Sequence, residues 1–521
     1  MKTIITSKNE SVSRGKIKWL FYSAVILFFY LPQNVVGQEK SVKVSDSIFS
    51  KILNEQRKLQ IVFPEGYNAN STDKYDVIYT SDGEWNTEMI SQMQEYTTDW
   101  KFIPKNIIVG IENTYVDGVN HRDRDLTPTH DDIQPLSGKA DNFLAFLKDE
   151  LIPYINKTYA VTGENTLFGH SHGGTFAMYA LLTEPQLFKS YIAADPSLWW
   201  DNKYMAKLAA EKLPGMSNIH ATLYISGREG KAYKGMGIDT MDSILNTKAP
   251  KGLLWESIIY PNEHHVSVKL KSIYDGLKQS YRGYTDETIT FHPMGGIVEK
   301  GKPYNIFRGS DNIFIHYTLD GSEPVLDSPL MNEIMELNGP AELKVKPVSF
   351  RSSNNSTTTG HFIEGKALKP LSKPKRAVAG GLNYSYYEGE WDKIPDFSKL
   401  KPVKTGIANK DFDLDKLPRK DHFACRFEGS IEIKEEGYYA FGITSDDGSK
   451  LYLNNTLLID NDGSHDSSSL KSYMVPLKTG FYPIRLEYFQ KDGDKQYNII
   501  YLKPGTTDPM PLPLEIQYYN E

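Results

Sequence analysis

The residues best suited to chemistry lie in one short stretch, Gly169–Gly173, which reads G-H-S-H-G. An apolar run, 166–168, leads into this stretch, and apolar residues at helical spacing follow it. A serine between two glycines in such a strand, turn and helix is typical of a nucleophile elbow, because only a sharp turn projects the hydroxyl beyond the edge of a sheet. The pattern therefore predicts that Ser171 is a nucleophile.

A histidine is needed beside this serine, because the hydroxyl is a weak nucleophile until a base removes its proton. The segment Pro261–Ser267 follows the last strand expected in this part of the chain and contains two adjacent histidines, His264 and His265. We favour His265 as the base. The sequence alone separates the two poorly.

A carboxylate must then hold the imidazole in the correct tautomer, and the chain order places this acid between the serine and the histidine. Glu229 is our first choice because it follows the expected strand 221–226, at the sheet edge where active groups gather. The competing interpretation is a solvated loop acid paired with Arg228. Asp195, at the end of the preceding strand, and Asp239 are the alternatives.

The tetrahedral intermediate of such a reaction requires two preorganised N–H donors. We expect one from the amide of His172, directly after the nucleophile, and the other from Gly83 or Glu84, in the loop after strand 75–79. His170 and His172 could also be read as a pair of metal ligands, but alternate side chains splay apart around an elbow. We therefore predict that catalysis needs no cofactor.

The composition sets limits on the class of protein. The chain has 521 residues, of which 39% are hydrophobic and 24% charged, as in soluble globular proteins of two or three domains. The net charge of -7 gives no electrostatic footprint for nucleic acid. Cys425 is the single cysteine, which excludes an intramolecular disulfide.

The N-terminus has the pattern of an export signal. Basic residues from Lys2 to Lys18 precede an apolar run, 19–31, and small residues just before Gln38 offer a cleavage point. This run is too short to span a bilayer comfortably, so we expect no membrane anchor. Residues 1–37 are predicted to be a signal peptide, and the mature protein is predicted to be periplasmic or secreted.

Three blocks follow the signal peptide. Residues 38–284 alternate expected strands with helical stretches such as 140–155, which argues for a mostly parallel, doubly wound sheet. Residues 288–364 and 382–521 contain strands bounded by Gly and Asp turns and are predicted to be two all-β sandwich domains. The Pro, Lys, Arg and Gly of 365–381 predict an exposed linker.

The first block resembles the esterase family of the α/β-hydrolase superfamily that includes enterochelin, feruloyl and acetyl-xylan esterases and esterase D. The matching motifs are Ser81–Glu84, Arg124–Pro128, Glu150–Ile155, Gly169–Gly174, Asp195–Trp200 and Glu263–Val268. The resemblance implies an α/β-hydrolase fold and a triad of Ser171, His265 and Glu229. The chain departs from the family at His172, where Leu or Met is usual, and at Asp195, where Ser is frequent, so the acid stays open.

The two β-rich blocks resemble accessory domains. Tyr317–Pro324 resembles the small sandwich at the ends of chitobiases and hexosaminidases, and Tyr386–Trp391 with Ser445–Ser449 resembles the anthrax protective-antigen-type sandwich. Sugar-binding members of the second type hold Ca²⁺ with paired aspartates, which implies Asp446 and Asp447 as calcium ligands. The same pair also suits turn geometry without a metal.

Together these features predict an exported serine esterase that removes acetyl or feruloyl groups from polysaccharides or oligosaccharides. The C-terminal domains would tether the enzyme to its ester-substituted glycan and raise its local concentration there. One alternative is a siderophore-lactone esterase of the enterochelin type, which we rank second because a soluble siderophore requires no tether. The other is a non-enzymatic glycan-binding protein on a hydrolase scaffold, against which the apparently complete triad argues.

Overall fold

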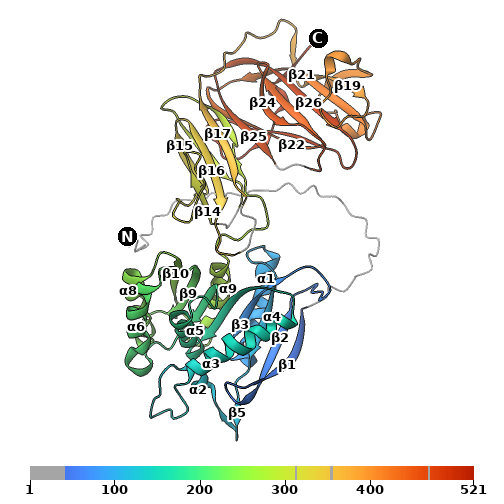
Figure 1. Ribbon diagram of the computed structural model, residues 1–521. Coiled ribbons are helices and arrows are strands. Elements are labelled where there is room, and N and C mark those ends of the chain that lie inside the picture. Colours follow the sequence, from blue (N-terminus) through green and yellow to red (C-terminus); the bar gives the residue numbers. More distant parts are fainter. Residues whose placement is uncertain (1–40, 311–313, 352–355, 468–469) are drawn as a thin grey trace. The chain divides into compact units, whose positions relative to one another are not determined.

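The computed structural model describes residues 41–310, 314–351, 356–467 and 470–521 (Figure 1). The predicted signal peptide, 1–37, lies outside the described residues. The described chain forms two compact units: an α/β unit within residues 41–295 and 300–364, and a C-terminal unit within residues 296–299 and 365–521. In the described parts of both units, no helix is long and apolar enough to cross a membrane.

An eight-stranded sheet with the order β1-β2-β4-β3-β7-β8-β9-β10 is the centre of the α/β unit. β1 and β2 pair antiparallel, as do β2 and β4, whereas every pairing from β4 to β10 is parallel. The strands are β1 (Val42–Ser50), β2 (Glu55–Phe63), β3 (Tyr75–Thr80), β4 (Asn106–Ile111), β7 (Val161–His170), β8 (Ser190–Ala194), β9 (Ala221–Arg228) and β10 (Leu253–Tyr260). β3, β4 and β8 are buried along their whole length, as expected for a parallel sheet covered on both faces.

Helices cover the two faces of this sheet and create one apolar core on each. On one face, α1 (Gly83–Asp99) and α9 (Val268–Ser280) pack over Ile78, Ile108 and Ile192. The other face is covered by α3 (Ala140–Phe146), α4 (Ile152–Thr158), α5 (His172–Thr183), α6 (Trp200–Lys212) and α8 (Ile238–Lys248). The predicted helix 140–155 is present, with one turn of π-helix, Leu147–Leu151, between α3 and α4.

A small β block, residues 288–364 apart from 296–299, follows the α/β sheet in the same unit. It contains two antiparallel groups of strands: β11 (Phe291–His292), β13 (Pro303–Arg308) and β15 (Ile334–Asn338), and β14 (Ile315–Thr318), β16 (Ala341–Pro347) and β17 (Thr358–Glu364).

One arginine fastens this small β block to the α/β sheet. Arg351, in the loop after β16, is 3% exposed and donates hydrogen bonds to Asp76 at 3.0 Å, Thr166 at 2.5 Å and Ser190 at 3.0 Å. Its guanidinium also lies 4.3 Å from the centre of the Tyr281 ring. Because a buried charge requires such partners, the small β block is an integral part of the α/β unit.

The C-terminal unit consists of two mostly antiparallel sheets around a core rich in aromatic side chains, and β12 (Gly295–Val298) joins one of them through a parallel pairing of Gly296 with Met474. Tyr386, Tyr482 and Tyr488 are fully buried in this core, so part of the high tyrosine content serves packing. One sheet contains β18 (Ala377–Ala379), β19 (Leu382–Glu388), β20 (Lys404–Ala408), β21 (Phe423–Ile433), β23 (Ser449–Leu453), β24 (Thr456–Asn461), β26 (Gly480–Gln490) and β29 (Gln517–Asn520), and the other contains β22 (Gly437–Asp446), β25 (Lys471–Leu477), β27 (Gln496–Leu502) and β28 (Met510–Pro511).

The segment 365–381 differs from the exposed linker that its composition predicts. Leu368 forms a bridge with Leu477, Leu371 forms one with Phe481, and β18 pairs with β29. These contacts use backbone groups, for which the side-chain composition gives no signal. The segment therefore belongs to the edge of the C-terminal unit.

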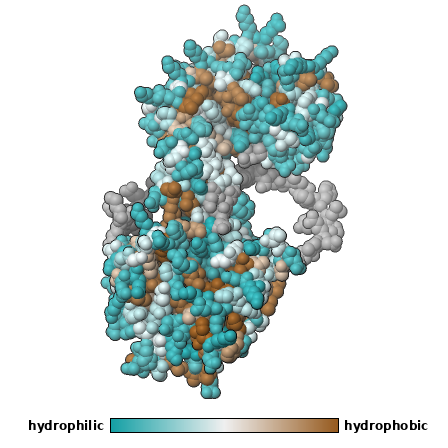
Figure 2. Space-filling view, in the orientation of Figure 1, coloured by the Kyte–Doolittle hydropathy of each residue, from teal (hydrophilic) through white to brown (hydrophobic). Residues whose placement is uncertain are grey.

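The surface of both units is mixed in character. On the face shown in Figure 2, hydrophilic residues predominate and hydrophobic residues form scattered patches. Scattered apolar side chains of this kind are normal on globular proteins, so the position of a functional site has to come from chemistry.

Candidate active site

The turn between β7 and α5 presents Ser171 in a strained backbone conformation, with φ 60° and ψ -119°. A Cβ atom at Gly169 would lie 2.0 Å from the carbonyl oxygen of Gly173, and one at Gly173 would lie 2.5 Å from Ser81 Oγ. Glycine is therefore required at both positions. Backbone strain of this kind is typical of functional turns. The Ser171 hydroxyl lies 3.2 Å from Ser197 Oγ.

The carboxylate that meets the candidate base is Asp195. His265 Nδ1 lies 2.6 Å from Asp195 Oδ2, and Arg228 Nε donates to the same oxygen at 2.5 Å. Asp195 is fully buried and follows β8, the strand beside β7, which ends just before Ser171. Since a carboxylate accepts, Nδ1 of His265 carries the proton and Nε2 is left as the basic nitrogen.

Glu229, our first choice for the acid, lies elsewhere. Its carboxylate is exposed and accepts a hydrogen bond from the backbone N–H of Asn262 at 2.9 Å. The expected Arg228–Glu229 pair is replaced by the ion pair of Arg228 with Asp195, which is buried and cannot be left without a partner. Asp239, the other alternative, lies in the first turn of α8 and accepts a hydrogen bond from Thr240. The geometry therefore favours Asp195.

The two adjacent histidines have different partners. His264 Nδ1 accepts a hydrogen bond from the Ser267 N–H at 3.2 Å, which closes a local turn. The His265 side chain is 38% exposed while its Nδ1 reaches Asp195, so one edge of the ring stays open to a substrate. The arrangement favours His265 over His264 as the base.

The backbone N–H groups expected to stabilise the oxyanion belong to the first residues of two helices, α5 and α1. His172 is the first residue of α5, and Gly83 and Glu84 are the first two residues of α1. Amides at such positions have no partner within their own helix and carry the positive end of its dipole. A Cβ at Gly173 would lie within 3.4 Å of Asp82 Oδ2, so the loop before α1 adjoins the elbow. These amides remain the predicted oxyanion donors.

An ion pair that the sequence did not reveal holds this loop. Arg122 donates from Nε to Asp82 Oδ1 at 2.6 Å, from Nη2 to Asp82 Oδ2 at 2.9 Å, and from Nη2 to the His170 carbonyl at 3.2 Å. Burial acts against the charge, but the Asp82 carboxylate raises the pKa of Arg122, which stays charged. The only signal in the sequence was its position two residues before the motif Arg124–Pro128.

The histidines on either side of the serine point to different partners, as expected for an elbow. His170 Nε2 lies 2.6 Å from the carbonyl oxygen of His265, whereas the His172 ring packs against Trp200 with 5.2 Å between ring centres. Burial, and secondly the charge of Arg122, lower the pKa of His172. Its ring is therefore neutral at physiological pH.

The predicted calcium pair lies at a turn of the C-terminal unit. Asp447 Oδ1 accepts from Ser464 Oγ and from the His465 N–H, both at 3.0 Å, and Oδ2 accepts from the Lys491 N–H at 2.7 Å. Burial, and secondly Asp447, raise the pKa of Asp446. Among the described residues, no group of three or more His, Cys, Asp or Glu is arranged to hold a metal ion. The contacts suit a turn, and calcium binding stays a prediction.

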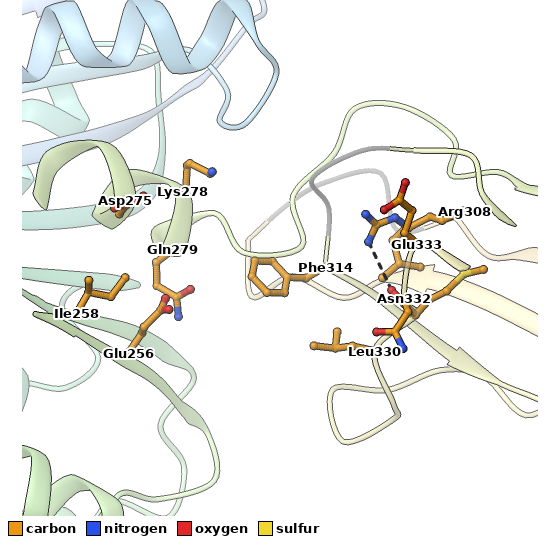
Figure 3. Close-up of a pocket in the computed structure, with 12 residues that line it drawn as sticks. Glu256, Ile258, Asp275, Lys278, Gln279, Arg308, Phe314, Leu330, Asn332 and Glu333 are labelled. Carbon is orange, nitrogen blue, oxygen red and sulfur yellow. Dashed lines mark hydrogen bonds between the residues drawn. The ribbon is translucent and has the colours of Figure 1, made fainter. Parts of the chain in front are cut away.

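A separate cavity of about 500 Å³ lies between β10, α9 and the small β block (Figure 3). Its lining includes Glu256 and Gln279 from the α/β sheet and its helix, and Arg308 and Phe314 from the small β block. Ser171, His265 and Asp195 are not among the lining residues. The candidate active site is therefore recognised by its chemistry and not by the size of a cavity.

Comparisons with protein families agree with this site. Residues 50–225 match the family described as putative esterase, and residues 381–508 match the PA14 domain. The two matches cover separate parts of the chain, one in the α/β unit and one in the C-terminal unit. The esterase match contains Ser171 and Asp195 and ends before His265, and the PA14 match contains Asp446 and Asp447.

Individual relatives of the esterase domain act on siderophores according to their names. The siderophore enterobactin esterase of Emericella nidulans is 34% identical over 139 residues, which are 23% of this chain and 46% of the relative. The ferri-bacillibactin esterase BesA of Bacillus subtilis is 39% identical over 74 residues, 14% of this chain and 26% of the relative. The matches span less than half the length of these two relatives.

Among solved structures, an IroE-like serine hydrolase from Shewanella oneidensis is 33% identical, with a TM-score of 0.42. The likeness covers 46% of this chain and 79% of that chain. The family match and the curated relatives support a carboxylic-ester hydrolase.

Proposed function

We propose that the protein hydrolyses carboxylic esters, with Ser171 as nucleophile, His265 as general base and Asp195 as the acid of the triad. The observation that carries the proposal is the 2.6 Å contact between His265 Nδ1 and the buried Asp195 carboxylate, beside the strand that ends at the elbow. The match of residues 50–225 to an esterase family supports it independently.

In the proposed reaction, His265 Nε2 takes the hydroxyl proton while Ser171 Oγ attacks the ester carbonyl carbon. The oxygen that becomes negative is stabilised by the amide of His172 and by that of Gly83 or Glu84. The imidazolium then gives its proton to the leaving alcohol as the C–O bond breaks. Water, activated by the same histidine, hydrolyses the acyl-enzyme and restores the serine.

The substrate that we propose is a siderophore ester, which was the second choice from sequence. The two curated relatives described above are named as esterases of siderophores, and this outweighs the argument that a soluble substrate needs no tether. Trp85, 51% exposed, and Trp199, 44% exposed, follow the Gly83 loop and Asp195 in sequence and offer flat apolar surface near the site.

The test compares kcat/KM of the purified protein on a ferric catecholate lactone, a feruloyl ester and an aryl acetate. A siderophore esterase hydrolyses the lactone at least tenfold better than the other two. Preference for the feruloyl ester or the acetate would instead support acyl removal from glycans, and no turnover of any of them would support a non-enzymatic binding protein.

Acyl removal from a glycan is the second candidate, because the PA14 domain gives the chain an additional domain that could tether it to polysaccharide. We further propose that residues 1–37 direct export and that the mature protein works outside the cytoplasm. Sedimentation of the full chain with insoluble polysaccharide, with and without Ca²⁺, tests both tethering and the predicted role of Asp446 and Asp447. N-terminal sequencing of the mature protein tests export.

A further inference from the structure

We propose that His170 is a positioning residue, which holds the loop of the catalytic histidine through a hydrogen bond from its Nε2–H to the main-chain carbonyl of His265. The proposal rests on the proposed triad. It assigns a role to a side chain that the sequence suggested only as half of a metal pair.

The geometry fixes the direction of this bond. His170 Nε2 and the His265 carbonyl oxygen are 2.6 Å apart, and a carbonyl only accepts, so the proton is on Nε2. The two rings also pack together, with 4.5 Å between their centres. His170 is the last residue of β7 and directly precedes Ser171. The bond therefore joins the strand of the nucleophile to the loop of the base.

His170 serves this role without adding charge to the site. Burial, and secondly the neighbouring His265, lower the pKa of His170 to about 4. The ring is neutral above that pH and keeps its single N–H. A lysine or arginine here could donate the same bond, but its charge would oppose the imidazolium that forms on His265 during the reaction.

The loop 261–267 needs such a contact because it has no regular secondary structure of its own. Asp195 holds the His265 ring through Nδ1, and His170 holds the main chain of the same residue. Two fixed points define where Nε2 lies relative to Ser171 Oγ. A misplacement of about 1 Å in a catalytic group can lower a rate by about 100-fold, so a lost bond has a measurable effect.

The experiment separates the hydrogen bond from the ring contact. His170→Gln keeps a donor of similar reach and removes the ring, whereas His170→Phe keeps a ring and removes the donor. The main readout is the rate at which diisopropyl fluorophosphate labels Ser171, where the serine oxygen displaces fluoride from phosphorus and no natural substrate is needed. The second readout is kcat and KM on an aryl acetate. His130→Phe, at a side chain that is 58% exposed in the loop before α3, is the control.

We expect His170→Phe to lower the labelling rate and kcat by roughly 30–100-fold, with KM within about threefold of wild type. His170→Gln should stay within about fivefold of wild type, and His130→Phe should match it. Thermal unfolding confirms that each variant is folded, and His170→Met, also without a donor, replaces His170→Phe if that variant does not fold.

Two results would overturn the proposal: labelling of the donor-free variants at the wild-type rate, or an equal loss in His170→Gln and His170→Phe. A loss confined to KM would also contradict a positioning role. Failure of the proposed triad is a different result, because the wild-type protein itself would then resist labelling.

Discussion

At the scale of single residues, the arrangement around Asp195 decides how the histidine works. One carboxylate oxygen receives both the His265 ring and Arg228, in a site where Asp195 has no exposure to water. The carboxylate holds the ring tautomer and stabilises the imidazolium that forms in the reaction. Glu229, exposed and bonded to the Asn262 amide, is in a position to do neither.

The first prediction follows from this difference. Asp195→Asn should lower kcat by about 10³–10⁴-fold, because an amide can hold the ring in the wrong tautomer and cannot stabilise an imidazolium. Glu229→Gln should change kcat by less than about threefold. Steady-state kinetics of both variants on an aryl ester test this prediction. A larger loss of kcat in Glu229→Gln than in Asp195→Asn would instead identify Glu229 as the acid of the triad.

The nucleophile gives a second prediction. Ser171→Ala should lower ester hydrolysis by about 10³-fold or more, because only the oxyanion donors and substrate binding would remain. The same change should leave Tm nearly unchanged, since the strained φ of 60° belongs to the backbone and remains in the variant. Near-wild-type turnover in Ser171→Ala would refute the role of the elbow.

The structure brings Asp195, and not our first choice Glu229, to His265, and the sequence could not separate these two acids for a physical reason. Asp195 and Glu229 both follow strands that end at the same edge of the sheet, and the periodicity of a strand does not say how the next residue turns. The choice depends on Arg228, whose side chain crosses from β9 to the neighbouring strand. Such a cross-strand ion pair leaves no local trace in the sequence.

At the scale of elements, the motif Arg124–Pro128 has a structural role. Arg124 binds Glu55 at the start of β2 through two nitrogens, and Arg57, on the same strand, binds Asp125 at 2.6 Å. The pairs tie α2 (Arg122–Leu126) to the sheet and so support Arg122, which holds the Asp82 loop. The charged residues of this motif therefore hold α2 in position and have no role in binding the substrate.

A third prediction concerns the pH dependence of this contact. Burial acts to raise the pKa of Glu55, but Arg124 and Arg57 outweigh it and hold the value at about 2, below the ordinary 4.5. A lowered folded-state pKa stabilises the protein above the ordinary value, and this stability disappears as the pH falls from about 4.5 to about 2. Glu55→Gln should therefore lower Tm by roughly 2–4 °C at pH 7.

Calorimetry between pH 3 and pH 7 tests this expectation, with the exposed Glu95→Gln as control. The difference between Glu55→Gln and wild type should shrink toward the acid end of the range, whereas the control should follow wild type throughout. A difference that is constant with pH would contradict the assigned ion pairs.

At the scale of the whole molecule, the sheet that carries the site alternates strands and helices as the sequence predicts, whereas the structure joins the small β block to this sheet in one unit. The sequence did not predict β1, an edge strand whose residues are mostly exposed and in which Asp46 interrupts the apolar alternation of Val42, Val44 and Ile48. It also missed how the small β block joins the α/β sheet. Arg351 and Asp76 are 275 positions apart, and neither lies in a pattern that would predict the other.

The last prediction concerns this long-range contact. Arg351→Met should destabilise the α/β unit by about 3–5 kcal/mol, because it leaves the Asp76 carboxylate buried without its charge partner. Tm should fall by roughly 5–10 °C, while kcat of the folded protein at 25 °C should change little, since Arg351 reaches the sheet far from the Ser171 end of β7. Arg376→Met, at an exposed arginine of the C-terminal unit, is the control.

A double-mutant cycle tests the pairing directly. Because Asp76→Asn removes the same charge pair, the double variant Asp76→Asn with Arg351→Met should lose much less unfolding free energy than the sum of the two single variants. Additive losses would mean that the two residues act independently and that the small β block is held by other contacts.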